Sequence, residues 1–95
     1  MPSADPQLPA RVALADEVVW QSVEGQVVLM AGDGETYLRL GDVGSRMWEI
    51  LDEDGDVAAA IPALLREFRV DEDTLRRDLA AFLADLQQRS LVAFT

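Results

Sequence analysis

The sequence predicts an α+β domain in which a three-stranded antiparallel sheet is followed by three helices. Two observations carry this prediction. The first half of the chain holds short β-branched and aromatic runs separated by glycine-containing turns, and the second half holds apolar residues at helical spacing. A length of 95 residues, 49% of them hydrophobic, suits one compact domain.

The first ten residues differ in composition from the rest of the chain. They hold Pro2, Pro6 and Pro9 and few apolar residues that could anchor them. We therefore expect a flexible lead-in over residues 1–10 and a folded domain over residues 11–95.

The first two predicted strands form a hairpin. The run VVWQSV, from Val18 to Val23, is β-branched and aromatic, and Glu24-Gly25 makes a short turn into the next run. That run, Gln26 to Ala31, is apolar on both faces, which is typical of a strand that is covered on both sides or flanked by neighbours. It is predicted to be the central strand.

The third predicted strand, Glu35 to Leu40, alternates between two faces. One face carries Thr36, Leu38 and Leu40, and the other carries Glu35, Tyr37 and Arg39. This pattern is typical of an edge strand. Nothing else in the sequence offers an obvious partner for its outer edge.

The first two helices are predicted from N-caps and apolar stripes. Asp42 is the expected N-cap of a helix that runs to about Glu53, with Trp48 as a core residue. Asp56 caps the second helix, where Pro62 predicts a kink or a later start at a possible cost of about 3 kcal/mol. The stripes are Val43, Met47, Ile50 and Leu51 in the first helix, and Val57, Ile61, Leu64, Leu65 and Phe68 in the second.

The third helix is predicted to run from its N-cap Asp71 to about Arg89. Acidic residues in its first turn complement the helix dipole. Ser90 then releases the chain into LVAF, a short apolar tail that can pack back on the core. The stripe of this helix is Leu75, Leu79, Phe82, Leu83 and Leu86.

Composition argues against several classes of function. The chain has no cysteine and no histidine, which removes disulfides, most zinc sites and the commonest general base, so no catalytic residue, metal or cofactor is expected. Its basic residues are all arginine, and its formal net charge of −10 repels nucleic acid. No apolar run is long enough for a membrane span or a signal peptide, so we expect a cytoplasmic protein without a membrane partner.

Helix two, a tight turn and helix three behind a small sheet make a winged helix-turn-helix arrangement, which often reads DNA. The would-be recognition helix argues against that function, because its acidic residues outnumber its arginines. They are Asp71, Glu72, Asp73, Asp78 and Asp85, against Arg76, Arg77 and Arg89. DNA binding therefore stays a minor alternative.

Three further motifs have both a functional and a structural interpretation. Gly32–Gly34 could cradle a phosphate, but it precedes no helix directly, so a hairpin turn is favoured. The acidic run Asp52–Asp56 could bind Ca²⁺, but it lacks the longer loop with a terminal Glu ligand, so solvated capping is favoured. Glu49, Asp52 and Asp78 could serve as acid and base, but no apolar pocket is evident, so an enzyme is the least favoured alternative.

The order of the elements and the residues themselves resemble the PqqD-like superfamily, the recognition elements of ribosomally synthesised and post-translationally modified peptide (RiPP) pathways. The resemblance covers about Leu14 to Val92. It rests on VVLM, ETYLRL, Gly44 with MWEIL, DV at Asp56-Val57, Phe68–Asp71 and DLAAFLADL. The chain departs from the family's pattern at Gly41, where Asn is common, and at Ser90 near the end of helix three, where Gly is common.

The resemblance implies a non-catalytic adaptor that binds the leader peptide of a precursor and delivers it to a separate enzyme. The chain is most similar to the stand-alone recognition protein of a split lasso-peptide protease, whose partner is a transglutaminase-like cysteine protease. The alternative within the family is a peptide chaperone for a radical enzyme in pyrroloquinoline quinone biosynthesis.

The resemblance also implies where the leader peptide binds. In this family the peptide adds as an extra strand to the third strand and lies against the third helix, a mode known as β-augmentation. The backbone of Thr36, Tyr37, Leu38, Arg39 and Leu40 would then pair with the peptide. Leu75, Leu79 and Phe82 would form the floor of a groove, with Arg76 and Asp78 on its rims, and either rim could face the peptide.

Overall fold

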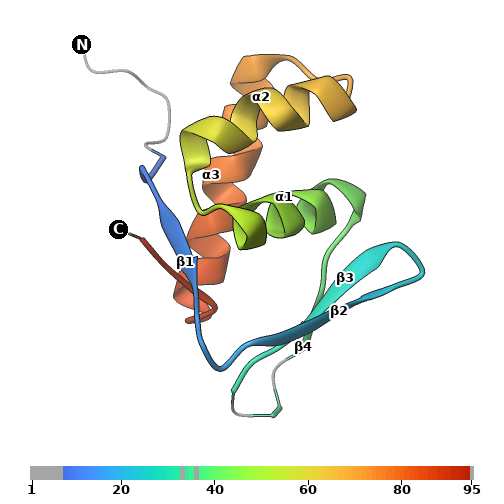
Figure 1. Cartoon of the computed structure of the whole chain (residues 1–95), viewed down its shortest axis with the longest axis vertical. Coiled ribbons are helices and arrows are strands. Elements are labelled where there is room, and N and C mark those ends of the chain that lie inside the picture. Colours follow the sequence, from blue (N-terminus) through green and yellow to red (C-terminus); the bar gives the residue numbers. More distant parts are fainter. Residues whose placement is uncertain (1–7, 33, 36, 95) are drawn as a thin grey trace.

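Three helices cover one face of a three-stranded sheet, and a two-stranded ribbon joins segments from the two ends of the chain (Figure 1). The structure is a computed structural model that describes residues 8–32, 34–35 and 37–94. Helices gathered on one side of an antiparallel sheet define an α+β domain, so the predicted fold class is confirmed.

The three-stranded sheet has the order β2-β3-β4 and is antiparallel throughout. Strands β2 (Val19–Val23) and β3 (Gln26–Met30) form the predicted hairpin, and β4 (Tyr37–Arg39) pairs with the other side of β3. The turn residues Glu24 and Gly25 both have positive φ, as a tight two-residue hairpin turn requires. The second run is therefore the central strand, as predicted.

The two-stranded ribbon was not foreseen as a sheet. Strand β1 (Val12–Leu14) pairs antiparallel with β5 (Val92–Phe94), so the LVAF tail packs back on the core as a strand. In Figure 1 the ribbon lies beside the lower half of α3 (Glu72–Gln88), and α3 contacts β5. Residues 8–10 of the predicted lead-in are described, and the Ala10 carbonyl accepts a hydrogen bond from the Val57 N–H at 3.1 Å.

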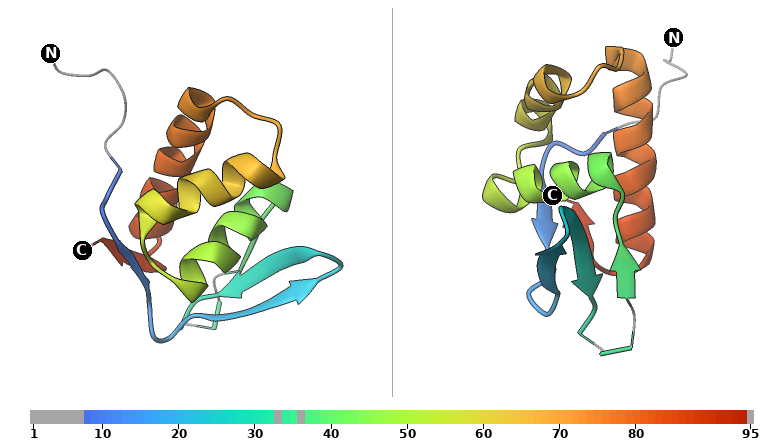
Figure 2. Two further views of the ribbon diagram at one scale, coloured as in Figure 1. Left: turned by 45° about the horizontal axis from the view of Figure 1, so that its top comes forward. Right: turned by 90° about the vertical axis from the view of Figure 1, so that its right-hand side faces the viewer.

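The helices stack in order on the sheet. Helix α1 (Asp42–Glu53) contacts β3, and α2 (Val57–Glu67) contacts α1 on the side away from the sheet, while α3 crosses behind both (Figures 1 and 2). No helix of the described chain is long and apolar enough to cross a membrane. Helix α2 begins at Val57 and continues through Pro62, so the alternative of a later start is wrong.

The start of α1 differs from the prediction. Its N-cap is Gly41, which has no side chain to accept a hydrogen bond, and Asp42 is the first helical residue. Strand β4 leads into this helix with almost no loop, so Asp42 is already inside the first turn. Its carboxylate accepts a hydrogen bond from Gln26 Nε2 at 3.2 Å instead. The predicted role of Asp42 as an N-cap is therefore wrong.

The caps of the other two helices are as predicted. The Asp56 carboxylate accepts from the Ala59 N–H at 3.4 Å, which confirms the capping interpretation of the acidic run before α2. The Asp71 carboxylate accepts from the Thr74 N–H at 2.9 Å. This hydrogen bond, with a second from the Thr74 hydroxyl, lowers the pKa of Asp71 below its ordinary value.

The core lies between the sheet and the helices. Val27 and Leu29 of β3 are fully buried against it, whereas Val28 and Met30 on the opposite face are only half-buried. Trp48 is 1% exposed, as predicted, and its ring meets Trp20 edge to face with the centroids 6.4 Å apart. The central strand is therefore flanked by neighbours at both edges, whereas only one of its two apolar faces is covered.

Candidate functional site: the open edge of strand β4

Strand β4 has one edge paired and one edge open within the described part of the chain. The Leu40 N–H donates to the Val27 carbonyl at 2.9 Å, and Leu38 lies opposite Leu29. Alternate residues of a strand direct their backbone groups to opposite neighbours, so Tyr37 and Arg39 direct theirs away from β3. Figure 2 (right) shows β4 on the side of the sheet next to α3. We call this outer side of Tyr37–Arg39 the β4 edge.

The sheet has a second free edge, the outer side of β2. Val23 lies opposite Gln26 across the hairpin turn, so Val23 and Gln21 direct their backbone groups toward β3. Trp20 and Ser22 therefore direct theirs outward. No strand pairs with β2 on that side among the residues that the structure describes. A binding experiment must accordingly distinguish the β4 edge from the β2 edge.

A buried serine holds the end of the β4 edge in register. Ser45 of α1 is 3% exposed and is the one buried polar residue of the described chain. Its Oγ accepts a hydrogen bond from the Val27 N–H at 2.7 Å and donates to the Leu40 carbonyl at 3.2 Å. With the bond from Leu40 to Val27, this hydroxyl ties β3, the end of β4 and α1 together. The position of the edge therefore depends on a helix residue.

Helix α3 approaches the β4 edge through Phe82. A Cβ atom added at Gly44 would lie 3.4 Å from Phe82 Cε1 and 3.6 Å from Leu40 Cβ, so the ring packs where β4 passes into α1. Phe82 is half-buried. It is therefore the residue of the predicted apolar floor that retains surface beside the strand.

Leu75 and Leu79 expose almost no surface in this structure. They are 1% and 0% exposed and belong to the core, together with Leu83 and Leu86 of the same helix. The apolar stripe of α3 is the side by which this helix packs on the other helices. Phe82 lies at the margin of that stripe. Their role as the floor of a peptide groove stays a prediction, and of the three predicted floor residues Phe82 is the one that is only half-buried.

The two predicted rims lie on different sides of α3. Arg76 lines a hollow of about 370 Å³ with α2 and the segment from Leu8 to Ala10, and its Nε donates to Glu72 Oε2 at 2.8 Å. Asp78 is exposed and precedes Phe82 by one helical turn, so these two residues are neighbours on the helix surface. Arg76 therefore lies on the side of α3 that meets α2 and the Leu8–Ala10 segment, whereas Asp78 is a neighbour of Phe82 on the helix surface.

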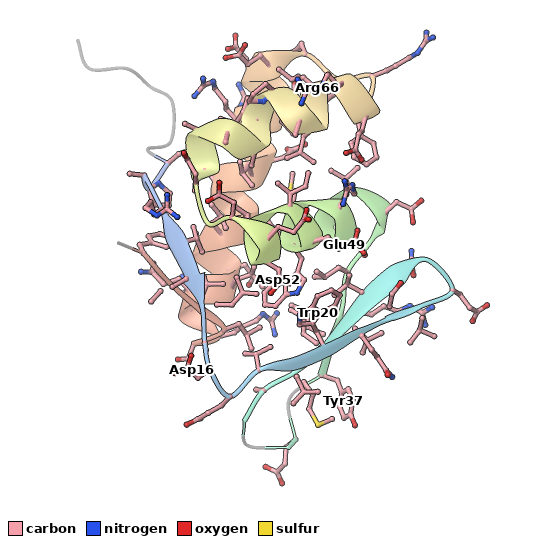
Figure 3. All side chains as sticks on the ribbon, viewed as in Figure 1. Asp16, Trp20, Tyr37, Glu49, Asp52 and Arg66 are labelled. Carbon is pink, nitrogen blue, oxygen red and sulfur yellow. The ribbon has the colours of Figure 1, made fainter. Side chains whose placement is uncertain are left out.

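The remaining predicted contact residues belong to the strand itself. Tyr37 is 63% exposed and Arg39 is exposed, whereas Leu38 and Leu40 turn toward the core. Figure 3 shows Tyr37 on the face of the sheet away from the helices and Trp20 on the helix side. Thr36 lies outside the described residues, as does Asp33 in the predicted hairpin turn, where the Gly34 N–H donates to the Ala31 carbonyl at 3.0 Å.

The alternative carboxylate and metal sites find no support in the geometry. Asp52 and Asp78 are exposed on different helices, and Glu49 is held by Arg46 at 3.3 Å, so these groups lack the shared apolar pocket that an acid and base pair needs (Figure 3). Arg46 also pairs with Glu67 at 2.6 Å, which lowers the pKa of Glu67 and ties α1 to α2. No group of three or more metal-binding side chains occurs among the described residues.

Sequence patterns alone did not identify Ser45 as part of the site. Its only signal is that one small polar residue occupies a buried position between Gly44 and the apolar run Met47–Trp48. A helix pattern can reveal such a position, but its two hydrogen-bond partners lie 5 and 18 residues away in the chain.

Comparisons with known proteins bear on this site. The family described as Coenzyme PQQ synthesis protein D (PqqD) matches residues 26–92. None of the curated proteins matches the chain in sequence. The solved structure "TbiB1 in Complex with the TbiA(beta) Leader Peptide" has 35% sequence identity and a TM-score of 0.79, over 84% of this chain and 93% of that chain. "Lasso peptide synthetase B1 complexed with the leader peptide" has 23% identity and a TM-score of 0.78, over 88% and 99%, and that likeness shows the fold.

Proposed function

Because the chain belongs to the PqqD family, we propose that it binds the leader peptide of a ribosomally synthesised precursor as a strand added to the β4 edge. The observation that carries this proposal is the outward row of backbone groups on Tyr37 and Arg39, left open by every described strand. A relative with 35% identity was solved in complex with a leader peptide, which supports the same class of ligand here.

The β4 edge suits a peptide better than the β2 edge does. Phe82 of α3 packs where β4 passes into α1, and Asp78 is its neighbour on the helix surface, so we expect an added strand to gain side-chain contacts as well as backbone hydrogen bonds. Backbone pairing provides affinity with little demand on sequence, and neighbouring side chains provide selection. We expect a Kd between about 10 nM and about 10 μM.

The proposal has a second step, in which the bound leader is delivered to a separate transglutaminase-like cysteine protease of a lasso-peptide pathway. It rests on the resemblance of the chain to stand-alone recognition proteins. A radical enzyme of pyrroloquinoline quinone biosynthesis is the alternative recipient, because the description of the matching family names that coenzyme. Mixing the chain with each enzyme and its precursor distinguishes the two, because the correct enzyme should process the precursor faster when the chain is present. Processing by the chain alone would contradict an adaptor role.

The binding step is tested by proline substitution at both sheet edges. A fluorescein-labelled TbiA(beta) leader peptide serves as the probe in anisotropy titrations with the full chain. Tyr37→Pro removes an outward N–H of β4, and the matched Ser22→Pro removes an outward N–H of β2. Tyr37→Pro should weaken binding about tenfold or more, whereas Ser22→Pro should leave the Kd within about twofold. The reverse pattern, or titrations without any binding, would refute the assignment of this peptide to β4.

Duplex DNA is the control ligand in the same titrations. A domain with a net charge of −10 gains little from counterion release, so no retention is expected at about 0.15 M salt. Specific binding of a DNA sequence at submicromolar protein concentration would favour the winged-helix alternative instead.

A further inference from the structure

The sheet face opposite the helices carries apolar side chains that the described chain leaves uncovered. Val19 and Tyr37 are each 63% exposed, and Val28 and Met30 between them are half-buried. The four residues, together with residues Trp20 and Gln21 of β2, line a hollow of about 170 Å³. Figure 3 shows that the helices cover only the other face. This outer face continues to Tyr37, so it ends at the strand where the peptide is proposed to add.

Arg39 lies on the same outer face and is the only basic residue of strands β2, β3 and β4. Its Nε donates to Gln26 Oε1 at 2.9 Å, and Gln26 in turn donates to Asp42. Within the described chain no carboxylate oxygen lies within ion-pair distance of Arg39, whereas Arg11, Arg46, Arg76 and Arg89 each have a carboxylate partner. Arg39 is thus oriented through its Nε, and among the described residues its two terminal amino groups have no carboxylate partner.

An added strand would place its own side chains beside these two residues. Side chains alternate along a strand, and those on the same face of neighbouring strands pair directly. Leu38 points to the helices, so a peptide residue opposite it lies on the side of α3. The peptide residues opposite Tyr37 and Arg39 lie on the outer face, two positions apart.

We propose that the outer face selects the peptide at two peptide positions, an acidic residue beside Arg39 and an apolar residue beside Tyr37. This inference rests on the proposed function. The charge of Arg39 is complementary to a carboxylate, and an exposed aromatic ring beside Met30 pairs with an apolar side chain. In an antiparallel peptide the acidic residue comes two positions before the apolar residue, and in a parallel peptide it comes two positions after. The order therefore reports the direction of the added strand.

The experiment is a selection of random peptides of about 14 residues, displayed on their own mRNA, on the immobilised full chain. Peptides that bind wild type but not Tyr37→Pro are counted as β4 binders. The selection is repeated on Arg39→Glu and on Arg69→Glu, an exposed arginine between α2 and α3. Both variants change the net charge equally, so an effect confined to Arg39→Glu is local.

β4 binders of wild type and of Arg69→Glu should share an acidic residue two positions from an apolar one, and Arg39→Glu should instead select a basic residue there. In synthetic binders, replacing the acidic residue by its amide should weaken binding about threefold to fivefold in wild type and not in Arg39→Glu. Tyr37→Ser should relax the apolar position alone.

β4 binders with no acidic preference, or with one that Arg39→Glu leaves unchanged, would overturn this inference while the proposed function stands. A selection that yields no peptide sensitive to Tyr37→Pro would overturn both.

Discussion

The two sheets of this domain are both antiparallel, but the ribbon of β1 and β5 is bonded on its outer side, and the β4 edge is open. On the ribbon, the Val12 N–H donates to the Gly55 carbonyl at 2.9 Å, and the backbones of Arg11 and Asp56 form an isolated antiparallel β-bridge. The loop between α1 and α2 therefore covers the outer side of β1. On β4, the described strands bond only to the inner side. A closed edge adds stability, whereas an open edge leaves backbone groups for a partner.

This contrast predicts where substitutions should affect stability and where they should affect binding. Substitutions around the ribbon should lower the free energy of unfolding and leave the peptide affinity of the folded protein unchanged. Substitutions on the outer side of β4 should do the reverse.

The largest effect is expected from Gly55→Ala. A Cβ at this position would lie 2.1 Å from the Val12 carbonyl oxygen, which is backbone and cannot rotate away. We expect the free energy of unfolding to fall by about 3 kcal/mol, as measured by urea denaturation. The matched control is Gly41→Ala, whose Cβ meets no atom within 4 Å. Equal stability of the two variants would show that β1 does not pack against this loop.

Proline at successive positions of β4 should separate folding from binding. Leu38 directs its N–H to β3, so Leu38→Pro should lower the free energy of unfolding by about 2 to 3 kcal/mol. Tyr37→Pro should change it by less than about 1 kcal/mol and abolish most peptide binding. Thermal melting followed by circular dichroism and anisotropy measure the two effects. Leu38→Ala separates loss of the side chain from loss of the N–H. If both proline variants folded and bound the peptide like wild type, β4 would not be the docking strand.

Ser45→Ala should have a somewhat smaller effect, because it removes one hydroxyl. The Val27 N–H would remain buried without its acceptor, which we expect to lower the free energy of unfolding by about 2 kcal/mol. Amide exchange at Leu40 should quicken more than exchange in α3. The control is Ser22→Ala, at an exposed serine of β2. Uniform quickening across the chain would argue against a local role of Ser45 at the β4 edge.

Asp71 is the N-cap of α3, the helix that links the two regions. Helix α3 contacts β5 of the ribbon and reaches the end of β4 through Phe82. The hydrogen bond from the Thr74 N–H lowers the pKa of Asp71 below its ordinary value of 3.8. The ionised carboxylate therefore stabilises the fold above that pH, and this contribution is lost as the pH falls through the lowered pKa. Asp71→Asn should therefore reduce stability at pH 6, and the deficit should shrink below about pH 4. Denaturation at several pH values measures it, with Asp73→Asn as control. A deficit independent of pH would exclude this ionisation as its cause.

The smallest effect is expected from Ser90→Gly, and it should be stabilising. Ser90 has a φ of 60° after α3, and the Ser90 and Leu91 N–H groups donate to the Gln87 and Leu86 carbonyls at 3.0 and 2.9 Å. Glycine adopts this left-handed conformation without strain, so the free energy of unfolding should rise by about 0.5 to 1 kcal/mol. A melting curve at or below that of wild type would show that Ser90 is unstrained. Peptide affinity should not change.

Local patterns in the sequence are enough to define the elements and their faces. The alternation of Glu35 to Leu40 placed Leu38 inside and Tyr37 outside, and the caps at Asp56 and Asp71 marked two helix starts, because a strand period, a helix period and a cap are properties of neighbouring residues. The resemblance to a family then pointed to the third strand as the edge that a peptide would use.

Which elements meet is known from the folded structure alone. It paired Val12–Leu14 with Val92–Phe94, buried Leu75 and Leu79 while leaving Phe82 at the margin, and set Arg76 beside α2 and the Leu8–Ala10 segment. A periodic pattern states that a face is apolar without stating what covers it. The partner of that face depends on packing across the whole chain, and so does the hydroxyl of Ser45 that holds the end of β4 in place.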